Sequence, residues 1–304
     1  MGRDVSTQTG WAALFARRLP HAIGIAAALT ILALLFGALP LQAADPKQPA
    51  QPTLDAWDAY VQLVDSTMAS RVAGSIPFLY VDESPDLLQS VRTGGLVVTN
   101  IDPCEVPHGL IHHWVGAMFI PNVTLDQVAA VIGNYQSYGN FYQPFVAKSA
   151  VLERAGDTEK VNLLMVQKAY SVTAAVDTDY QVQIVRLDAN RIYIVSKAVR
   201  VQEIADFGKP GEHPFPEDRR PGYVWRTMGV TRLEQRDGGV YVEMETIALS
   251  RGIPAEFRWL IKPLTDKLPR NIMFQTLAAT RAAVIQQSAP AQSNDQNIAQ
   301  SAAH

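Results

Sequence analysis

Two glutamates near the C-terminal third of the chain have the type and spacing of an acid/base pair. Glu243 and Glu245 are separated by one residue in the segment 240–250, whose composition is typical of a β-strand. Side chains two residues apart on a strand point to the same side of a sheet. Two carboxylates held on one side could act as general acid and general base.

An ion pair is the alternative reading of the same residues. The sequence Asp237-Gly238-Gly239 predicts a tight hairpin between segments 223–236 and 240–250. A turn centred on Gly238-Gly239 places Arg232 opposite Glu245 and on the side of the two glutamates. We expect this charged side to face water, where a cross-strand pair contributes about 0.2–1 kcal/mol. The other side, with Val242, Met244 and Thr246, is expected to meet a closing helix.

His112 and His113 are the next candidates for chemistry. Adjacent residues on a strand point to opposite sides, so the two imidazoles cannot bind one metal ion. One of them is expected to line a cavity mouth or to lie half-exposed at a strand end. Cys104 is the only cysteine, and the prolines around it prevent a helical ligand face with His108 and His112. We predict neither a metal site, nor a cofactor, nor a catalytic residue set.

Composition narrows the class of protein. The chain has 304 residues, 48% of them apolar, which is enough for one good-sized core or two small ones. A formal net charge of −3 provides no basic surface for nucleic acid, so we expect no nucleic-acid partner. Phosphate-loop, nucleophile-elbow and zinc-protease motifs do not occur in the sequence.

The N-terminal segment 1–43 has the parts of an export signal. Arginines at positions 3, 17 and 18 precede an apolar run at 22–41, and small residues follow at 43–44. A run of about 20 apolar residues is also long enough to span a bilayer. We expect either a cleaved signal peptide or a retained anchor, and in both cases a location outside the cytoplasm, periplasmic or tethered to the membrane.

The remaining chain predicts a run of strands between helices. Leu54 to Gly74 has helical spacing, and Thr124 caps a second helix that ends near Gly139. Expected strands lie at 95–100, 110–122, 148–172 (with a turn near Gly156-Asp157), 177–204 (a hairpin) and 223–250. A helical segment follows at 253–287, broken around Pro263 to Pro269. Helices placed to one side of an antiparallel sheet make an α+β fold.

This order resembles the START-like and polyketide-cyclase-like superfamily, whose fold is called the helix grip. The resemblance rests on segments 116–138, 223–254, 253–270 and 274–284. It implies a curved antiparallel sheet that grips a long C-terminal helix, with an extra N-terminal helix in this chain. The implied domains are 1–43 (signal or anchor), 44–53 (linker), 54–108 (N-terminal helix and connection), 109–287 (ligand-binding domain) and 288–304 (disordered tail).

The resemblance implies an apolar cavity between the sheet and the last helix. The residues that we expect to line it are Phe119, Tyr193, Trp225, Met244, Met273 and Leu277. Candidate polar groups in the same cavity are His112, Arg232, Glu243 and Glu245. The loop 205–222, rich in Pro, Gly and charge, is either a lid over the cavity or a surface insertion.

The expected function is binding of a lipid or other hydrophobic small molecule, for carriage or sensing, with membrane contact left open. The alternative is an enzyme of cyclase or hydrolase type, which would need the polar candidates to converge in the cavity. A third reading is an interaction module whose cavity is filled by large side chains. Because proteins with this fold have many different activities, the fold alone does not distinguish these three functions.

Overall fold

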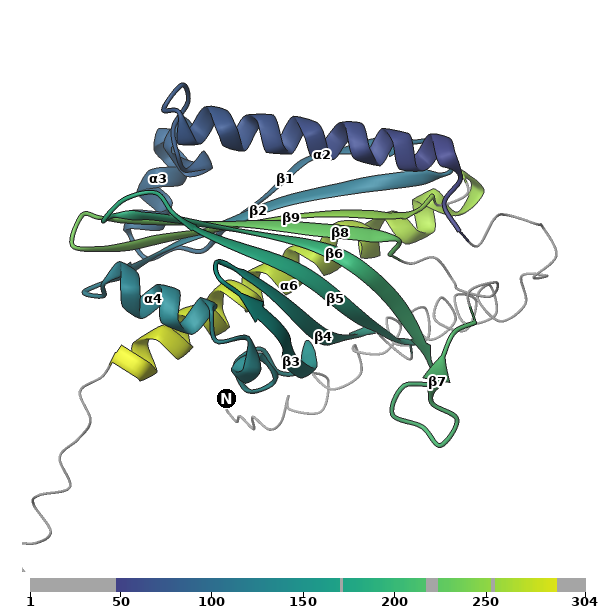
Figure 1. Ribbon diagram of the computed structural model, residues 1–304. Helices are drawn as coiled ribbons and strands as arrows, with labels where there is room; N and C mark the ends of the chain where they lie inside the picture. Colours follow the sequence, from purple (N-terminus) through teal and green to yellow (C-terminus); the bar gives the residue numbers. More distant parts are fainter. Residues whose placement is uncertain (1–47, 170–171, 217–223, 253–254, 289–304) are drawn as a thin grey trace, which may run out of the picture. The chain divides into compact units, whose positions relative to one another are not determined.

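The computed structural model describes residues 48–169, 172–216, 224–252 and 255–288 (Figure 1). Most of this part forms one unit built on a single large sheet. The expected signal or anchor at 1–43 and the expected tail lie outside the described residues, apart from Ser288, which ends the last helix.

In the part of the chain that the structure describes, the sheet has nine strands, all paired antiparallel, as the resemblance implied. The strands follow the order β1-β2-β9-β8-β6-β5-β4-β3, with the short β7 paired to β6. Their bounds are β1 Val97–Val106, β2 Gly109–Pro121, β3 Val146–Ala155, β4 Thr158–Ala169, β5 Val172–Arg186, β6 Arg191–Ala205, β7 His213–Pro214, β8 Arg226–Arg236 and β9 Gly239–Arg251.

Helices cover both faces of this sheet. The long helix α6 runs across one face, together with α4, and α2 lies along the other face with η1 and α3 (Figure 1). The bounds are α2 Gln51–Val72, η1 Tyr80–Glu83, α3 Pro85–Arg92, α4 Leu125–Ile132, η2 Tyr135–Ser137, α5 Tyr138–Phe141 and α6 Ala255–Ser288. The α+β helix-grip architecture with an extra N-terminal helix is confirmed.

Two hydrophobic cores result from this three-layer arrangement. We call the side of the sheet toward α6 the inner face; its core joins Trp114, Met118 and Val242 to Met273 and Leu277 of α6. We call the opposite side the outer face; its core joins Trp57, Val64 and Met68 of α2 to strand residues such as Met228, Ile247 and Leu249. Because β2 is covered on both sides, its residues from His113 to Met118 are buried without interruption.

Local signals explain where the helices begin and end. Thr124 accepts a hydrogen bond from the Gln127 backbone, and the Gln127 side chain bonds the Thr124 backbone, which is the predicted capping box. The helix α4 ends at Ile132, earlier than expected, because Gly133 terminates it before the short η2 and α5. Gly74, with φ of 75°, follows the end of α2 as predicted.

Three other boundaries differ from the sequence expectation. The strand expected at 95–100 continues to Val106 through a bulge between Ile101 and Cys104, so part of the expected connection before residue 109 is edge strand. The helix α6 is continuous through Pro263 and Pro269, and no break separates two pieces. Part of the loop after Ala205 folds back as β7, while residues 217–223 lie outside the described residues.

Candidate functional site

Among the described residues, α6 packs closely on the inner face at the β1–β2 edge of the sheet. The helix packs on β1 and β2, on α4 and on α5. At β2 the fit depends on Gly116: a Cβ atom there would lie 2.6 Å from Met273 Cγ and 2.9 Å from Leu277 Cδ1. A larger residue at this position would push α6 away from the sheet.

Beyond β2 the inner face remains accessible in the middle of the sheet. Thr246 of β9 is exposed, and Met244 and Ala248 on the same strand are half-buried. Several neighbouring inner-facing residues of β8 and β6 are half-buried as well, among them Thr231 and Ala198, while Ile194 and Leu233 are buried. Central strands of a nine-stranded sheet do not normally show accessible side chains on a face that a helix crosses. This accessible area, which we call the central inner face, is the candidate ligand site.

The expected cavity residues divide between the two faces. Met273 and Leu277 lie in the inner core, and the half-buried Met244 packs against it, which is the predicted side. Their role as ligand contacts stays a prediction.

Phe119, Tyr193 and Trp225 were assigned to the wrong side. All three pack with the outer core, under α2 rather than α6. Phe119 has the same parity on β2 as His113, and Tyr193 lies opposite Arg232 in the β6–β8 ladder, so alternation turns both outward. Trp225 precedes β8 and packs against the outer layer.

His112 is the only polar candidate whose strand position turns it inward. It alternates with Trp114 and Met118 of the inner core, and its Nε2 lies 2.9 Å from the Ser250 hydroxyl at the end of β9. It lies opposite Ala248 of β9, which is the next inner-facing residue after the exposed Thr246.

Arg232, Glu243 and Glu245 are outer-face residues, and they are buried instead of facing water. Their side chains are 2%, 0% and 10% exposed. Arg232 Nε donates to Glu243 Oε1 at 2.8 Å, and Arg232 Nη2 lies 2.6 Å from Glu245 Oε2. The expected common side is correct, but the expected contact with solvent is wrong because α2 and η1 cover this side.

The pairing between β8 and β9 also differs from the expected register. Arg232 lies opposite Glu243, and Glu245 lies opposite Val230. The turn residues are Asp237 and Gly238, both with positive φ, so Gly239 already pairs with Arg236. The shift by two positions leaves each residue on its expected face and makes the Arg232–Glu245 contact diagonal.

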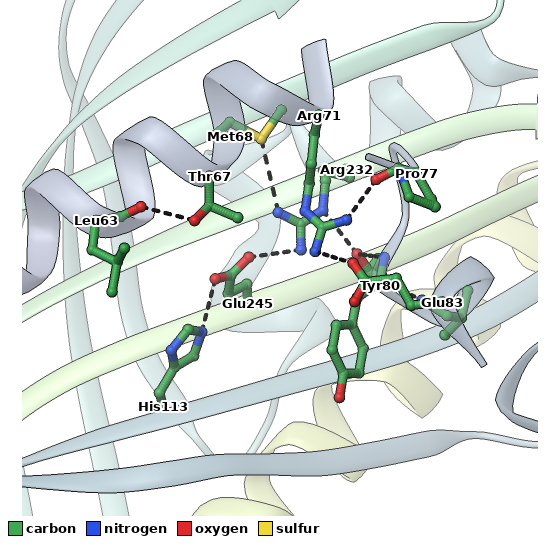
Figure 2. A network of polar contacts seen from close by, with 12 residues as sticks. Leu63, Thr67, Met68, Arg71, Pro77, Tyr80, Glu83, His113, Arg232 and Glu245 are labelled. Carbon is green, nitrogen blue, oxygen red and sulfur yellow. Dashed lines mark hydrogen bonds and ion pairs between the residues drawn. The ribbon is translucent and has the colours of Figure 1, made fainter. Parts of the chain in front are cut away.

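The N-terminal segment completes this buried polar cluster. Glu243 accepts hydrogen bonds from the backbone N–H groups of Tyr80 (2.9 Å) and Val81 (3.1 Å) at the start of η1. Figure 2 shows Arg232 between Met68 of α2 and Glu245 of β9, with its Nη1 lying 3.8 Å from the Met68 sulfur. Both glutamates and the arginine thus find partners on two layers, which is the condition for burying charge.

His113 links the cluster to α2. Its Nε2 lies 2.7 Å from Glu245 Oε1 and its Nδ1 lies 2.8 Å from the Tyr60 hydroxyl. A carboxylate only accepts hydrogen bonds, so Nε2 carries a proton and donates it to Glu245, while Nδ1 shares a hydrogen bond with the Tyr60 hydroxyl. The order Tyr60, His113, Glu245 has the form of an activated-nucleophile relay. Here the three side chains instead form the hydrogen bonds that link α2 to β2 and β9.

Neighbouring charge and burial shift the pKa of Glu245 in opposite directions. Burial alone would raise the pKa of this carboxyl group, but the hydrogen bond from His113 and the charge of Arg232 outweigh it and lower the pKa to about 2. Burial, supported by the nearby Glu245 carboxylate, raises the pKa of Tyr60. The cluster therefore holds Glu245 as an anion and Tyr60 as a neutral phenol.

Sequence reasoning missed Tyr60 and His113 as members of this cluster. A signal was present in the strand itself, because Tyr241, Ile247 and Leu249 share the side of the two glutamates and would not all face water. The layer that covers these residues could not be predicted in this way, since α2 lies about 170 residues before β8 in the chain.

Neither a metal site nor a membrane-spanning helix is found in the described part of the chain. No group of three or more His, Cys, Asp or Glu side chains there could hold a metal ion. None of the helices in these ranges is long and apolar enough to cross a bilayer.

Comparisons with known proteins relate the chain to other proteins by shape alone. No family model and no curated protein matches the sequence. The solved STAR-related lipid transfer protein fragment from Xanthomonas axonopodis is 18% identical, with 62% of this chain and 98% of that chain covered and a TM-score of 0.42. The Zhui aromatase/cyclase from Streptomyces sp. R1128 is 11% identical, with 58% and 95% covered and a TM-score of 0.42. Human STARD10 is 10% identical, with 67% and 80% covered and a TM-score of 0.41.

The fold is START-like. The antiparallel strand order and the long C-terminal helix across the inner face have the arrangement that the sequence resemblance implied. Likenesses at this distance say nothing about a ligand or a reaction in this START-like chain.

Proposed function

We propose that this chain binds a lipid or another hydrophobic small molecule on the central inner face, beneath α6, for carriage or sensing. The observation that carries the proposal is the accessibility of Met244, Ala248, Ala198 and Thr246 in the middle of a sheet whose other face is closed by α2. Burial of an apolar ligand there contributes about 25 cal/mol per Å² of apolar surface removed from water, without any chemical step.

Most of the polar groups that the enzyme alternative requires do not lie on the inner face. Arg232, Glu243 and Glu245 lie on the outer face, and only His112 remains on the inner side, bonded to Ser250 at the strand end. No observation favours a reaction over binding, so binding is the proposal that we retain.

Native mass spectrometry of gently purified full-length protein tests the proposal. We expect a bound molecule that denaturation releases, and binding of the neutral apolar dye Nile red after the protein has been delipidated. Protein that is always ligand-free and does not bind the dye would overturn the proposal.

A matched pair of variants locates the ligand. Ala198 is half-buried and packs against the inner core, while its neighbour Val199 is 56% exposed. Ala198→Trp should fill the central inner face and abolish ligand and dye binding, whereas Val199→Trp should leave both unchanged. Circular dichroism and thermal unfolding establish that each variant is folded. Equal binding by the two folded variants would place the ligand elsewhere.

We further propose that the chain acts outside the cytoplasm, on the strength of segment 1–43 with its arginines and apolar run. Intact-mass measurement of protein from cell fractions distinguishes the two forms. A cleaved chain in the soluble exported fraction indicates a signal peptide, and a full-length chain in the membrane fraction indicates an anchor that also provides membrane contact. Full-length chain in the cytosol would contradict the proposal.

A further inference from the structure

Hydroxyl groups form a compact patch on the central inner face. Thr246 of β9 lies opposite Gly229 of β8, and Gly229 lies opposite Ser196 of β6. Thr227 and Thr231 flank Gly229 at the same-face positions of β8. The four hydroxyls come from three adjacent strands, and Gly229 between them adds no side chain.

Two of these hydroxyls have no side-chain hydrogen-bond partner among the described residues. Ser196 Oγ lies 3.4 Å from the Gly229 carbonyl oxygen. Neither Thr231 nor Thr246 forms a side-chain hydrogen bond with any residue of the described chain, and Thr246 is exposed while Thr231 is half-buried. Each therefore offers one donor and free acceptor capacity toward the space under α6.

The inner-facing positions of β8 and β9 at the patch are uncharged, and the imidazole of His112 on β2 lies beside them, opposite Ala248. Among the described residues of β9 and β8 these positions hold Val, Met, Thr, Ala, Ser, Gly, Leu and Gln, and none is Lys, Arg, Asp or Glu. At the ends of the neighbouring strands, Glu159 is paired with Arg154, and Arg186 is paired with Asp126 of α4.

An ionised ligand group would therefore be poorly stabilised at the patch. Moving a phosphate or carboxylate from water onto an apolar face without a cation carries a large desolvation cost. Desolvation of a hydroxyl or carbonyl group costs less free energy. The threonine hydroxyls take the place of the water molecules to which such a group was hydrogen-bonded.

Resting on the proposed function, we infer that the ligand is an uncharged amphiphile, whose hydroxyl or carbonyl groups bind Thr231 and Thr246 while its apolar part lies along Met244 and Ala198. A phosphate-bearing lipid of the same chain length would have no Lys or Arg partner among the described inner-facing residues of β8 and β9. The hydroxyl patch acts as the specificity element of an otherwise apolar site.

Two water-soluble probes that differ only in a phosphate test the inference. The delipidated full-length protein is titrated with 1,2-dioctanoylglycerol and with the corresponding dioctanoyl phosphatidate, each competing with Nile red. We expect the neutral lipid to bind at least tenfold more tightly. Equal or tighter binding of phosphatidate would overturn the inference while leaving the proposed function intact, and a protein that binds neither lipid nor the dye would overturn both.

The isosteric double variant Thr231→Val/Thr246→Val tests the two hydroxyls directly. It should weaken dioctanoylglycerol binding by about tenfold or more and leave Nile red binding unchanged, because only hydrogen bonds are removed. Thr99→Val, the same change on the edge strand β1, is the matched control and should alter neither affinity. An unchanged affinity of the double variant for dioctanoylglycerol would also overturn the inference.

Discussion

Arg232 and Glu243 lie directly opposite one another across the β8–β9 ladder, bonded at 2.8 Å, and neither side chain reaches water. The pair is closed on its other side by the backbone of η1 and by Met68 of α2. An N-terminal segment is thus attached to the sheet through buried charge as well as through apolar packing. This attachment makes specific predictions about stability.

Removing the arginine should unfold the protein far more easily than removing a surface cation. Arg232→Met leaves Glu243 and Glu245 buried without their cation, and we expect a loss of about 3–5 kcal/mol in the free energy of unfolding, measured by urea titration. Lys197→Met is the control, because its pair with Asp65 also joins the sheet to α2 but is exposed, and it should cost less than about 1 kcal/mol. Similar losses in the two variants would show that burial of the pair is not decisive.

Stability should fall with acid through Glu245. Its pKa is about 2 in the folded protein and near 4.5 when it is unperturbed, so the unfolded state takes up a proton first as the pH falls. The contribution is fully present above the unfolded pKa and is lost as the pH falls from about 5 toward 2, amounting to about 3 kcal/mol. In the Glu245→Gln variant, the free energy of unfolding, measured by urea titration, should depend much less on pH over this range.

The control for this pH dependence is Glu212→Gln, a change at an exposed carboxylate. Its stability profile should keep the slope of the unmodified protein. A Glu245→Gln profile that falls as steeply as the unmodified one would assign the acid sensitivity to other carboxylates.

The Tyr60 hydroxyl should hold α2 onto the outer face. Tyr60→Phe removes the hydrogen bond to His113 Nδ1 and should lower stability by about 1 kcal/mol. Amide hydrogen exchange in α2 should become faster, with little change in β5 and β6. Ser66→Ala, on the exposed side of the same helix, should leave the exchange of α2 unchanged. Faster exchange in both variants would indicate a general loss of helix stability.

Gly116 should control how closely α6 approaches the sheet. Gly116→Ala places a methyl group against Met273 and Leu277, and we expect a loss of about 1–3 kcal/mol in thermal or urea unfolding. Adding Met273→Ala should recover part of this loss, because it removes the contact that clashes. Gly139→Ala, whose new methyl group would meet nothing closer than 3.7 Å, is the control, with an expected change near zero. Independent, additive effects of Gly116→Ala and Met273→Ala would contradict this contact.

The face of each residue in the C-terminal hairpin could be predicted from alternation alone. Val242 and Met244 lie toward α6, and Glu243 and Glu245 share the other side with Arg232, as the sequence indicated. The register could not be predicted as well, because Asp237-Gly238 and Gly238-Gly239 are both plausible turns. An error in the choice of turn shifts the partners and preserves the faces.

Local pattern therefore determined most of the strands, the cap at Thr124, the order of helices and strands, and the polarity of the two faces of the C-terminal hairpin, since these depend on residues near one another in the chain. Tertiary structure decided what covers each face. Whether Arg232, Glu243 and Glu245 meet water or a second layer depends on α2 and η1, which precede them by some 150 residues, and no strand pattern specifies a partner at that separation. The same is true of Phe119 and Tyr193, which look like cavity residues in the sequence and lie beneath α2 in the fold.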